Sequence, residues 1–165
     1  MKVWAIGLVL AAASASVQAQ TSGWGAFEDG EGHGVGVQSP DGAQLMLKCD
    51  KPGAGEVYAV VATTSGLVAP AQTFVMRPVQ VLYDHKPPYD DRWRFYEHAA
   101  IAINKGTERS LTRLLLDIKE AKTLRLQLDA EPRKRPPKIV NFDVAGAAQA
   151  LEHVYASCQD TIPVN

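Results

Sequence analysis

Apolar and polar residues alternate through most of the chain, which is the pattern of antiparallel strands that bury one face. In residues 43–49 the alternation places Leu45, Leu47 and Cys49 on one face, so the cysteine is expected to point inward. Residues 56–63 are apolar on both faces, which predicts a central strand. Further strands are predicted over 73–83, 92–103, 123–128 and 139–142. Pro78 cannot donate a ladder hydrogen bond, so its strand is expected to lie at an edge or to be bulged there.

Two segments change to the helical period of 3.6 residues. In residues 107–122, where Thr107 is a suitable N-cap, apolar residues recur every three or four positions: Leu111, Leu114 or Leu115, Ile118 and Ala121. The closing segment has Asp143 as its expected cap and one apolar stripe made of Val144, Ala148, Leu151, Tyr155 and Cys158. The whole pattern predicts an α+β fold, a mainly antiparallel β-sheet or small β-sandwich with two packed helices.

The first residues have the layout of a secretory signal peptide. Lys2 precedes an apolar run over residues 3–13, and a stretch of small residues ends in Val17-Gln18-Ala19. We expect residues 1–19 to be a signal peptide cleaved after Ala19, residues 20–42 a glycine-rich N-terminal segment, and residues 43–165 a single α+β domain. The apolar run is too short to span a bilayer, so no transmembrane anchor is expected. The protein is therefore predicted to be periplasmic or secreted.

The chain has two cysteines, Cys49 and Cys158. Export would place them in an oxidising compartment, where a cysteine pair is usually a disulfide. Both lie on the predicted buried faces of their own elements, so they can meet. We predict that they form one structural disulfide, which closes a loop of about 110 residues. A redox role is disfavoured because catalytic cysteine pairs are usually close in sequence.

The charge argues against one class of partner. The chain has a net charge of −1, from 17 basic and 18 acidic residues, which becomes −2 when Lys2 leaves with the signal peptide. Such a nearly neutral protein lacks the electrostatic footprint for nucleic acid. Residues 20–91 are acidic and residues 92–165 are basic. Chance asymmetry on a solvated surface is the simpler explanation, and electrostatic steering of a charged partner is the alternative.

Two polar clusters are candidate sites. Residues 84–91, predicted to be a loop stiffened by prolines, contain the candidate recognition residues Asp84, His85, Tyr89, Asp90 and Asp91. A plain solvated loop is the simpler interpretation. Arg133, Lys134 and Arg135 form a basic patch that could bind anionic glycans or lipid headgroups, or could belong to an ordinary hairpin loop. The four histidines are not spaced as metal ligands, and no serine lies in a nucleophile motif, so neither a metal nor a cofactor is predicted.

Several structural positions resemble a group of small exported bacterial proteins. The shared features are a strand that ends in cysteine, a Tyr-Asp step, a tryptophan before a leucine-rich helix, and a final strand and helix that end in cysteine. In this chain they are Leu45 to Cys49, Tyr83-Asp84, Trp93, Leu111 to Ala121, and Phe142 to Cys158. On these features the chain is similar to the type VI secretion-associated VasI proteins and, more remotely, to invasion-associated locus B proteins. The resemblance implies the fold and the compartment, and it carries over no catalytic residue.

Because the informative residues are structural, the leading hypothesis is a non-catalytic exported accessory protein of the bacterial cell envelope that acts through protein–protein contact. Its expected partner is another envelope or secreted protein, and the oligomeric state is left open. The alternative is a small envelope hydrolase or ligand-binding protein that uses residues 84–91. A deep pocket lined by His85, Tyr89 and Asp91 would favour this alternative.

Overall fold

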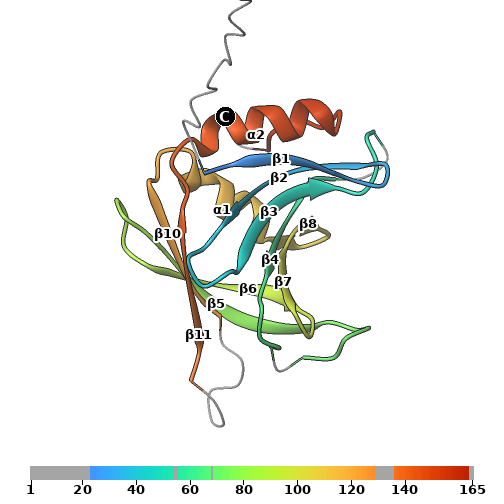
Figure 1. Ribbon diagram of the computed structural model, residues 1–165. Helices are drawn as coiled ribbons and strands as arrows, with labels where there is room; N and C mark the ends of the chain where they lie inside the picture. Colours follow the sequence, from blue (N-terminus) through green and yellow to red (C-terminus); the bar gives the residue numbers. More distant parts are fainter. Residues whose placement is uncertain (1–22, 54–55, 68, 129–135, 164–165) are drawn as a thin grey trace, which may run out of the picture.

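Nine antiparallel strands form one strongly curved sheet, which is the main wall of the molecule (Figure 1). The structure, a computed structural model, describes residues 23–53, 56–67, 69–128 and 136–163. The strands of the sheet are β1 (Gly25–Asp29), β2 (Gly32–Gln38), β3 (Gln44–Cys49), β4 (Tyr58–Ala62), β5 (Val75–Tyr83), β6 (Tyr89–Phe95), β7 (Ala99–Ala102), β10 (Thr123–Leu128) and β11 (Lys138–Asp143). A separate ribbon consists of β8 (Asn104–Lys105) and β9 (Glu108–Arg109). The predicted α+β fold with a mainly antiparallel sheet is confirmed.

The strand order in the sheet is β1-β2-β3-β4-β7-β6-β5-β10-β11. The glycine-rich residues after position 22 supply β1 and β2, so they belong to the same sheet as the rest of the domain. β4 pairs with β3 on one side and with β7 on the other, as its apolar residues on both faces predict. Its inward residues Ala59 and Val61 are fully buried, and the outward Val60 is only 9% exposed.

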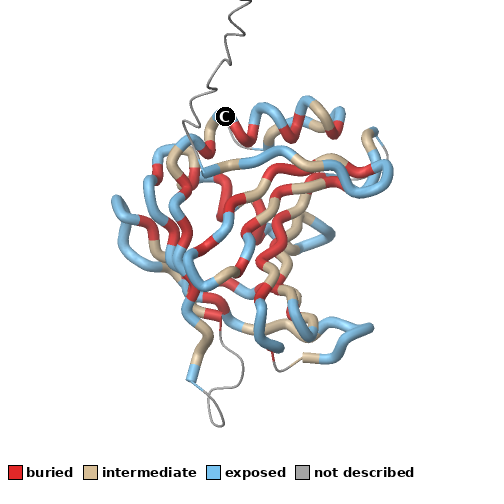
Figure 2. The backbone as a smooth tube through the Cα atoms, viewed as in Figure 1, coloured by how far each residue is buried: buried red, intermediate tan, exposed pale blue. Residues whose placement is uncertain are grey.

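The inner face of the sheet carries the core (Figure 2). Leu45, Leu47 and Cys49 are completely buried, as their alternation with polar residues predicts. The largest fully buried side chains elsewhere are Trp93, Phe95, Phe142, Leu111, Leu114, Leu115, Ile118, Leu124, Leu126 and Leu128. At roughly 2 kcal/mol for each large apolar side chain, the burial of this set is the main stabilising contribution to the fold.

Two helices pack against the sheet. Helix α1 (Ser110–Ile118) contacts β5, β6 and β7, and the Tyr83 hydroxyl donates a hydrogen bond to the carbonyl of Leu114 at 2.7 Å. Helix α2 (Ala147–Ser157) runs across one end of the molecule and packs against β2 and β3 (Figure 1). The buried face of α2 is Ala147, Ala150, Leu151, Val154 and Tyr155. The sequence pattern therefore identified both helices, although Ala148 is only half-buried.

Both predicted helix caps are wrong. Thr107 lies in the turn between β8 and β9, and α1 begins later because Asn104 Oδ1 accepts the N–H of Thr112 at 3.1 Å. The Asp143 side chain accepts the N–H of Ala145 at 3.1 Å, outside α2, and the N-cap of α2 is Gly146 with φ of 84°. Asn104 thus accepts a hydrogen bond from the first turn of α1, where Thr107 was expected to do so. Asp143 forms a turn before α2 and not the helix cap.

Two strand predictions also need correction. Residues 92–103 form two strands, β6 and β7, joined by a turn in which Tyr96 N–H donates to the carbonyl of Ala99. Residues 84–91 are not one loop, because β6 begins at Tyr89. Pro78 lies in β5, which has β6 on one side and β10 on the other, so the expected edge strand is wrong. Among the described residues, Pro78 lies opposite Arg92 of β6.

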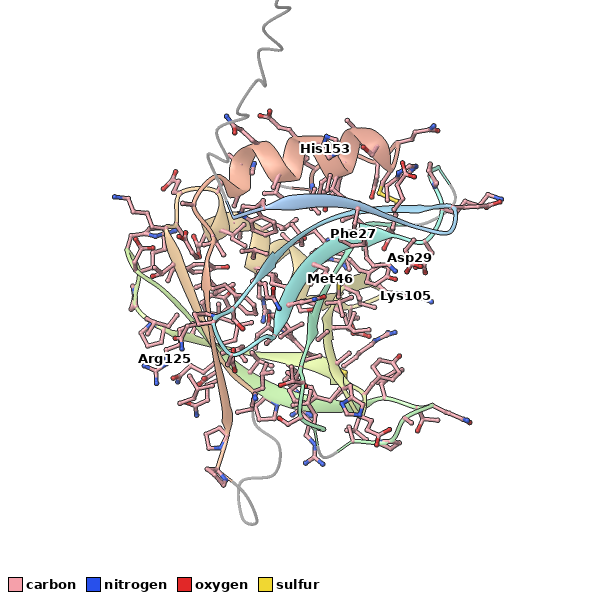
Figure 3. All side chains as sticks on the ribbon, in the orientation of Figure 1. Phe27, Asp29, Met46, Lys105, Arg125 and His153 are labelled. Atoms are coloured by element: carbon pink, nitrogen blue, oxygen red, sulfur yellow. A yellow bond between two sulfur atoms is a disulfide. The ribbon has the colours of Figure 1, made fainter. Side chains whose placement is uncertain are left out.

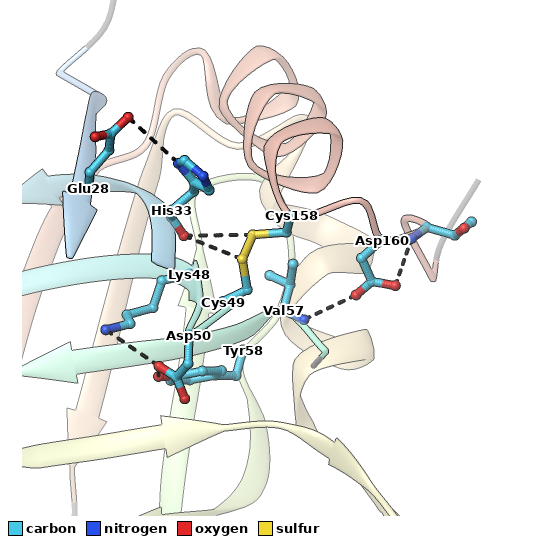
Figure 4. Close-up of a disulfide and its surroundings, with 10 residues drawn as sticks. Glu28, His33, Lys48, Cys49, Asp50, Val57, Tyr58, Cys158 and Asp160 are labelled. Atoms are coloured by element: carbon cyan, nitrogen blue, oxygen red, sulfur yellow. Dashed lines mark hydrogen bonds and ion pairs between the residues drawn. A yellow bond between two sulfur atoms is a disulfide. The ribbon is translucent and has the colours of Figure 1, made fainter. Parts of the chain in front are cut away.

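Cys49 and Cys158 form the predicted disulfide (Figure 4), with their Cα atoms 6.0 Å apart. Both residues are fully buried. The bond joins the end of β3 to the residue after α2, across 109 positions of sequence. No helix in the described ranges is long and apolar enough to cross a membrane.

The two ends of the curved sheet approach each other, and within the described residues β11 pairs only with β10. Trp24 Nε1 donates to the carbonyl of Val144 at 3.3 Å, close to the start of β1. Further along β11, Lys138 Nζ lies 3.7 Å from an oxygen of Asp41, in the turn between β2 and β3. Side chains from the two ends of the sheet thus hold this seam together, where a closed barrel would have backbone hydrogen bonds.

Candidate functional site

Two of the predicted recognition residues have structural partners. Asp84 Oδ1 accepts the N–H groups of Lys122 and Thr123 at 3.0 and 3.3 Å, so this carboxylate holds the start of β10. Burial opposes its ionisation, but these two hydrogen bonds outweigh that effect, and the pKa of Asp84 is lowered. His85 lies beside it, with Nδ1 at 3.6 Å from the same oxygen and its ring 6.0 Å from that of Tyr83.

Tyr89 and Asp91 lie on the inner face of β6. The Tyr89 hydroxyl is buried and makes no hydrogen bond within the described residues. Burial, followed by the negative charge of Asp91, raises the pKa of Tyr89 well above its usual value. The hydroxyl therefore stays protonated at physiological pH and is suited to donate a hydrogen bond rather than to act as a base.

Asp91 forms the most unusual ion pair of the molecule. Its side chain is 6% exposed, yet Oδ1 pairs at 3.0 Å with Nη1 of Arg113, whose side chain is 56% exposed. The same oxygen accepts the N–H of Arg92, whereas Oδ2 is buried with no hydrogen-bond partner in the described parts of the chain. Asp90, on the outer face of β6, accepts a hydrogen bond from Gln80 at 3.3 Å. The structure thus divides the predicted recognition cluster between two faces of one strand and the turn before it.

A groove of about 340 Å³ lies next to Asp91, and we call it the arginine groove. Arg92 comes from β6, Arg109 from β9 and Arg113 from α1, and Met76 and Pro78 of β5 form its apolar side. The β8–β9 ribbon forms the opposite wall, and the Arg94 guanidinium is bound to Glu108 at 3.0 and 2.6 Å beside it. His85 and Tyr89 do not line this groove. No local sequence pattern predicts this groove, because its three arginines belong to three different elements, β6, β9 and α1.

A second groove, of about 400 Å³, lies on the outer face of β1, β2 and β3, and we call it the β1 groove. Gly25, Gly36 and Met46 are opposite one another on the three strands, so the floor of the groove is partly bare backbone. Phe27 and Met46 project on the same face (Figure 3). A Cβ on Gly34 would be 2.3 Å from the Phe27 ring, so the ring rests directly on the glycine backbone.

β1 is an edge strand with acidic surroundings. Within the described chain its only strand partner is β2, and four of its five residues are exposed. Acidic residues gather at its far end and in the adjoining turns, namely Glu28, Asp29, Glu31 and Asp50. Lys48 and Lys51 pair with Asp29 and Glu31 at 2.8 and 3.2 Å, and the hydrogen bond from Lys48 lowers the pKa of Asp29. Lys48 also lies 3.7 Å from Asp50, so two lysines face four carboxylates and the cluster keeps an excess of two negative charges over the lysines.

A third groove, of about 790 Å³, opens along the seam between the end of β2 and the outer side of β10 and β11. Its lining includes Pro40, Arg125 and Asn141 as well as the buried side chains of Leu124 and Phe142. It is the largest of the three grooves described here, but Lys138 and Asp41 bridge the seam beside it. We regard it as a consequence of incomplete closure of the sheet.

The basic patch Arg133, Lys134 and Arg135 lies outside the described residues, as does the predicted signal peptide. In the described part of the chain no three His, Cys, Asp or Glu side chains are grouped so that they could hold a metal ion. No family model matches the chain, and neither curated proteins nor solved structures give a significant match.

Proposed function

We propose that this protein is a non-catalytic, exported accessory protein of the bacterial cell envelope, periplasmic or secreted, which binds an extended segment of another protein along β1. The observation that carries the proposal is the combination of a free strand edge with the β1 groove on the same strand. In strand addition, backbone hydrogen bonds supply affinity and pockets for alternate side chains supply specificity. β1 offers both elements.

The chemistry of the β1 groove defines the partner segment. A strand added to β1 would place every second side chain on the outer face, next to Gly25 and Phe27. Since the lining is mostly glycine backbone, Phe27, Val37 and Met46, an apolar side chain is the best occupant of the groove. The surplus of carboxylates, to which Glu28 and Asp50 contribute, favours basic residues beside it. The proposed partner segment is therefore extended, with alternating apolar and basic residues.

The envelope location is supported by separate observations. The buried disulfide is compatible with an oxidising compartment. The first nineteen residues have the pattern of a cleaved signal peptide, and the structural positions that resemble VasI proteins belong to exported proteins. A ligand-binding role, the second candidate, is favoured by the arginine groove, which includes Asp90 and Asp91.

The test is a groove-filling substitution, Gly25→Val. Nothing lies within 4 Å of a Cβ placed on Gly25, and its φ is not in the left-handed region, so the new side chain fits the fold and fills the groove. Envelope extract is passed over the immobilised protein, and the retained protein is mapped to a synthetic peptide. We expect Gly25→Val to weaken peptide binding by about tenfold or more, and hydrogen exchange of the β1 amides to slow when the peptide binds.

The matched control is Ala26→Val, which adds the same atoms to the next residue, whose side chain lies on the opposite face of β1. It should bind the peptide as the unmodified protein does. A retained protein whose binding is unaffected by Gly25→Val, and which leaves exchange of the β1 amides unchanged, would show that β1 is not the docking strand.

A further inference from the structure

We infer that the arginine groove is a binding site for the carboxylate group of an acid with a small apolar body. This site is separate from β1, and the inference does not depend on the proposed strand addition. It follows from the charges that are left uncompensated in the groove, from the way in which one arginine is held, and from the apolar side of the lining.

Two of the three carboxylates around the groove are engaged by arginines, and the third, Asp90, accepts a hydrogen bond from the neutral Gln80. Glu108 accepts two hydrogen bonds from Arg94, at 3.0 and 2.6 Å, and Asp91 is bound to Arg113. By contrast, Arg92 donates only to the backbone carbonyl of Met76, at 3.3 Å, and Arg109 only to the carbonyls of Gly106 and Glu108. Neither Arg92 nor Arg109 has a carboxylate within salt-bridge distance in the described structure. Both guanidinium groups therefore keep free donors and an unmatched positive charge.

Arg113 is held in place more firmly than a surface arginine usually is. Its guanidinium is anchored by the carboxylate of Asp91, which is 94% buried as judged by its 6% side-chain exposure. A buried carboxylate is costly unless it is paired, so Asp91 restricts where Arg113 can lie. We regard Asp91 as a positioning residue that fixes one wall of the groove, while the exposed part of Arg113 faces solvent and ligand.

The overall charge and the shape select the ligand. Counting Arg94 with the three lining arginines against Asp90, Asp91 and Glu108 leaves one net positive charge, which matches a monoanion. A planar guanidinium binds a carboxylate through two parallel hydrogen bonds. Pro78 lies directly opposite Arg92 across β5 and β6, so an apolar surface adjoins the charged one. A volume of about 340 Å³ is at the lower end for ligand sites, which favours a small apolar body over a large one.

The experiment is an NMR titration of the disulfide-bonded protein with hexanoate. We expect hexanoate to shift the signals of Arg92, Arg109 and Arg113, and hexan-1-ol, which lacks the charge, to leave them unchanged. Arg92→Gln and Arg109→Gln should each weaken hexanoate binding by roughly tenfold, because each removes a charge-assisted hydrogen-bonding group. Both side chains are exposed, so these variants should fold normally. Arg125→Gln, a change of the same kind on β10 outside the groove, is the control and should bind hexanoate normally.

Two further probes separate the sources of the acid. Binding of an apolar tripeptide with a free C-terminus, lost when that terminus is amidated, would identify a polypeptide C-terminus as the ligand. Binding of hexanoate with exclusion of the tripeptide would identify a small free acid. The inference is overturned if hexanoate fails to shift the groove signals, if both glutamine variants bind it normally, or if inorganic phosphate binds the same arginines more tightly than hexanoate does.

Discussion

Gln159 is the one described residue other than glycine with a positive φ, 53°. It directly follows Cys158, where the chain leaves α2, and a helix commonly ends with a left-handed residue that is usually glycine. Another segment binds to this turn, since the N–H of Gly53 donates a hydrogen bond to the carbonyl of Cys158 at 2.9 Å. The backbone at Gln159 is thus set by the helix end and the disulfide, although a side chain is disfavoured there.

The first prediction concerns this residue. Gln159→Gly should raise the free energy of unfolding, by up to about 1 kcal/mol, because glycine adopts the left-handed conformation without a steric penalty. The same change at Gln149, an exposed position inside α2, should instead lower it by about 1 kcal/mol, since glycine weakens a helix interior. Urea denaturation of both variants measures the two effects. Equal effects of the same sign would mean that the φ of Gln159 carries no strain.

Among the secondary-structure elements, β10 has its start held by Asp84, a residue that was predicted to recognise a ligand. Asp84 begins the turn after β5, and its carboxylate accepts the N–H groups of Lys122 and Thr123, at the point where the chain leaves α1 and enters β10. The sequence placed Asp84 correctly at the end of a strand but could not show which backbone groups would face it. Those donors come from 38 and 39 residues away.

The second prediction follows from the lowered pKa of Asp84. A carboxyl whose pKa is lower in the folded state stabilises the protein above its unfolded pKa, and this contribution is lost as the pH falls through the folded pKa. Asp84→Ala should therefore reduce stability clearly at about pH 7 and much less at about pH 2, as measured by urea denaturation at each pH. Asp84→Asn keeps an acceptor but cannot ionise, so it should be closer to the unmodified protein. A loss for Asp84→Ala that is the same at both pH values would contradict this.

Element types were easier to predict than element ends. The alternation of Leu45, Leu47 and Cys49, and the leucines of α1, depend only on burial of one face, and a local sequence pattern is enough to show that. The start of α1 depends on Asn104, which belongs to β8, so the position of Thr107 in the sequence predicted the wrong N-cap. The arginine groove has the same origin. Its residues meet only because β6, β9 and α1 converge, which no local period records.

For the molecule as a whole, the disulfide is the longest-range link that the sequence predicted. It connects β3 to the end of α2, and both partners are fully buried. Curvature of the sheet and its open seam were not predictable in this way, because they depend on the twist of nine strands together and on contacts such as Trp24 with Val144. The sequence pattern therefore predicted an antiparallel sheet or a small sandwich but could not distinguish between the two.

The third prediction is that loss of this bond destabilises the whole domain. The double variant Cys49→Ala with Cys158→Ala should have a free energy of unfolding lower by about 2 to 5 kcal/mol, because a cross-link over a long loop restricts the unfolded chain. Thermal unfolding of the double variant and of the oxidised protein gives the comparison. The unmodified protein treated with a reductant serves as a second measurement. An unchanged unfolding temperature in both would show that the bond contributes nothing to stability.

The disulfide also makes a covalent ring of the chain from Cys49 to Cys158, with residues 23–48 as a tail outside it. The arginine groove lies within the ring, whereas every residue that lines the β1 groove lies on the tail. A protease that cuts once inside the ring leaves both products joined, while one cut just before Cys49 breaks the covalent link between the β1 groove and the ring. In an environment rich in proteases, a single cut could therefore separate the β1 groove from the rest of the protein, whereas the arginine groove would stay covalently attached.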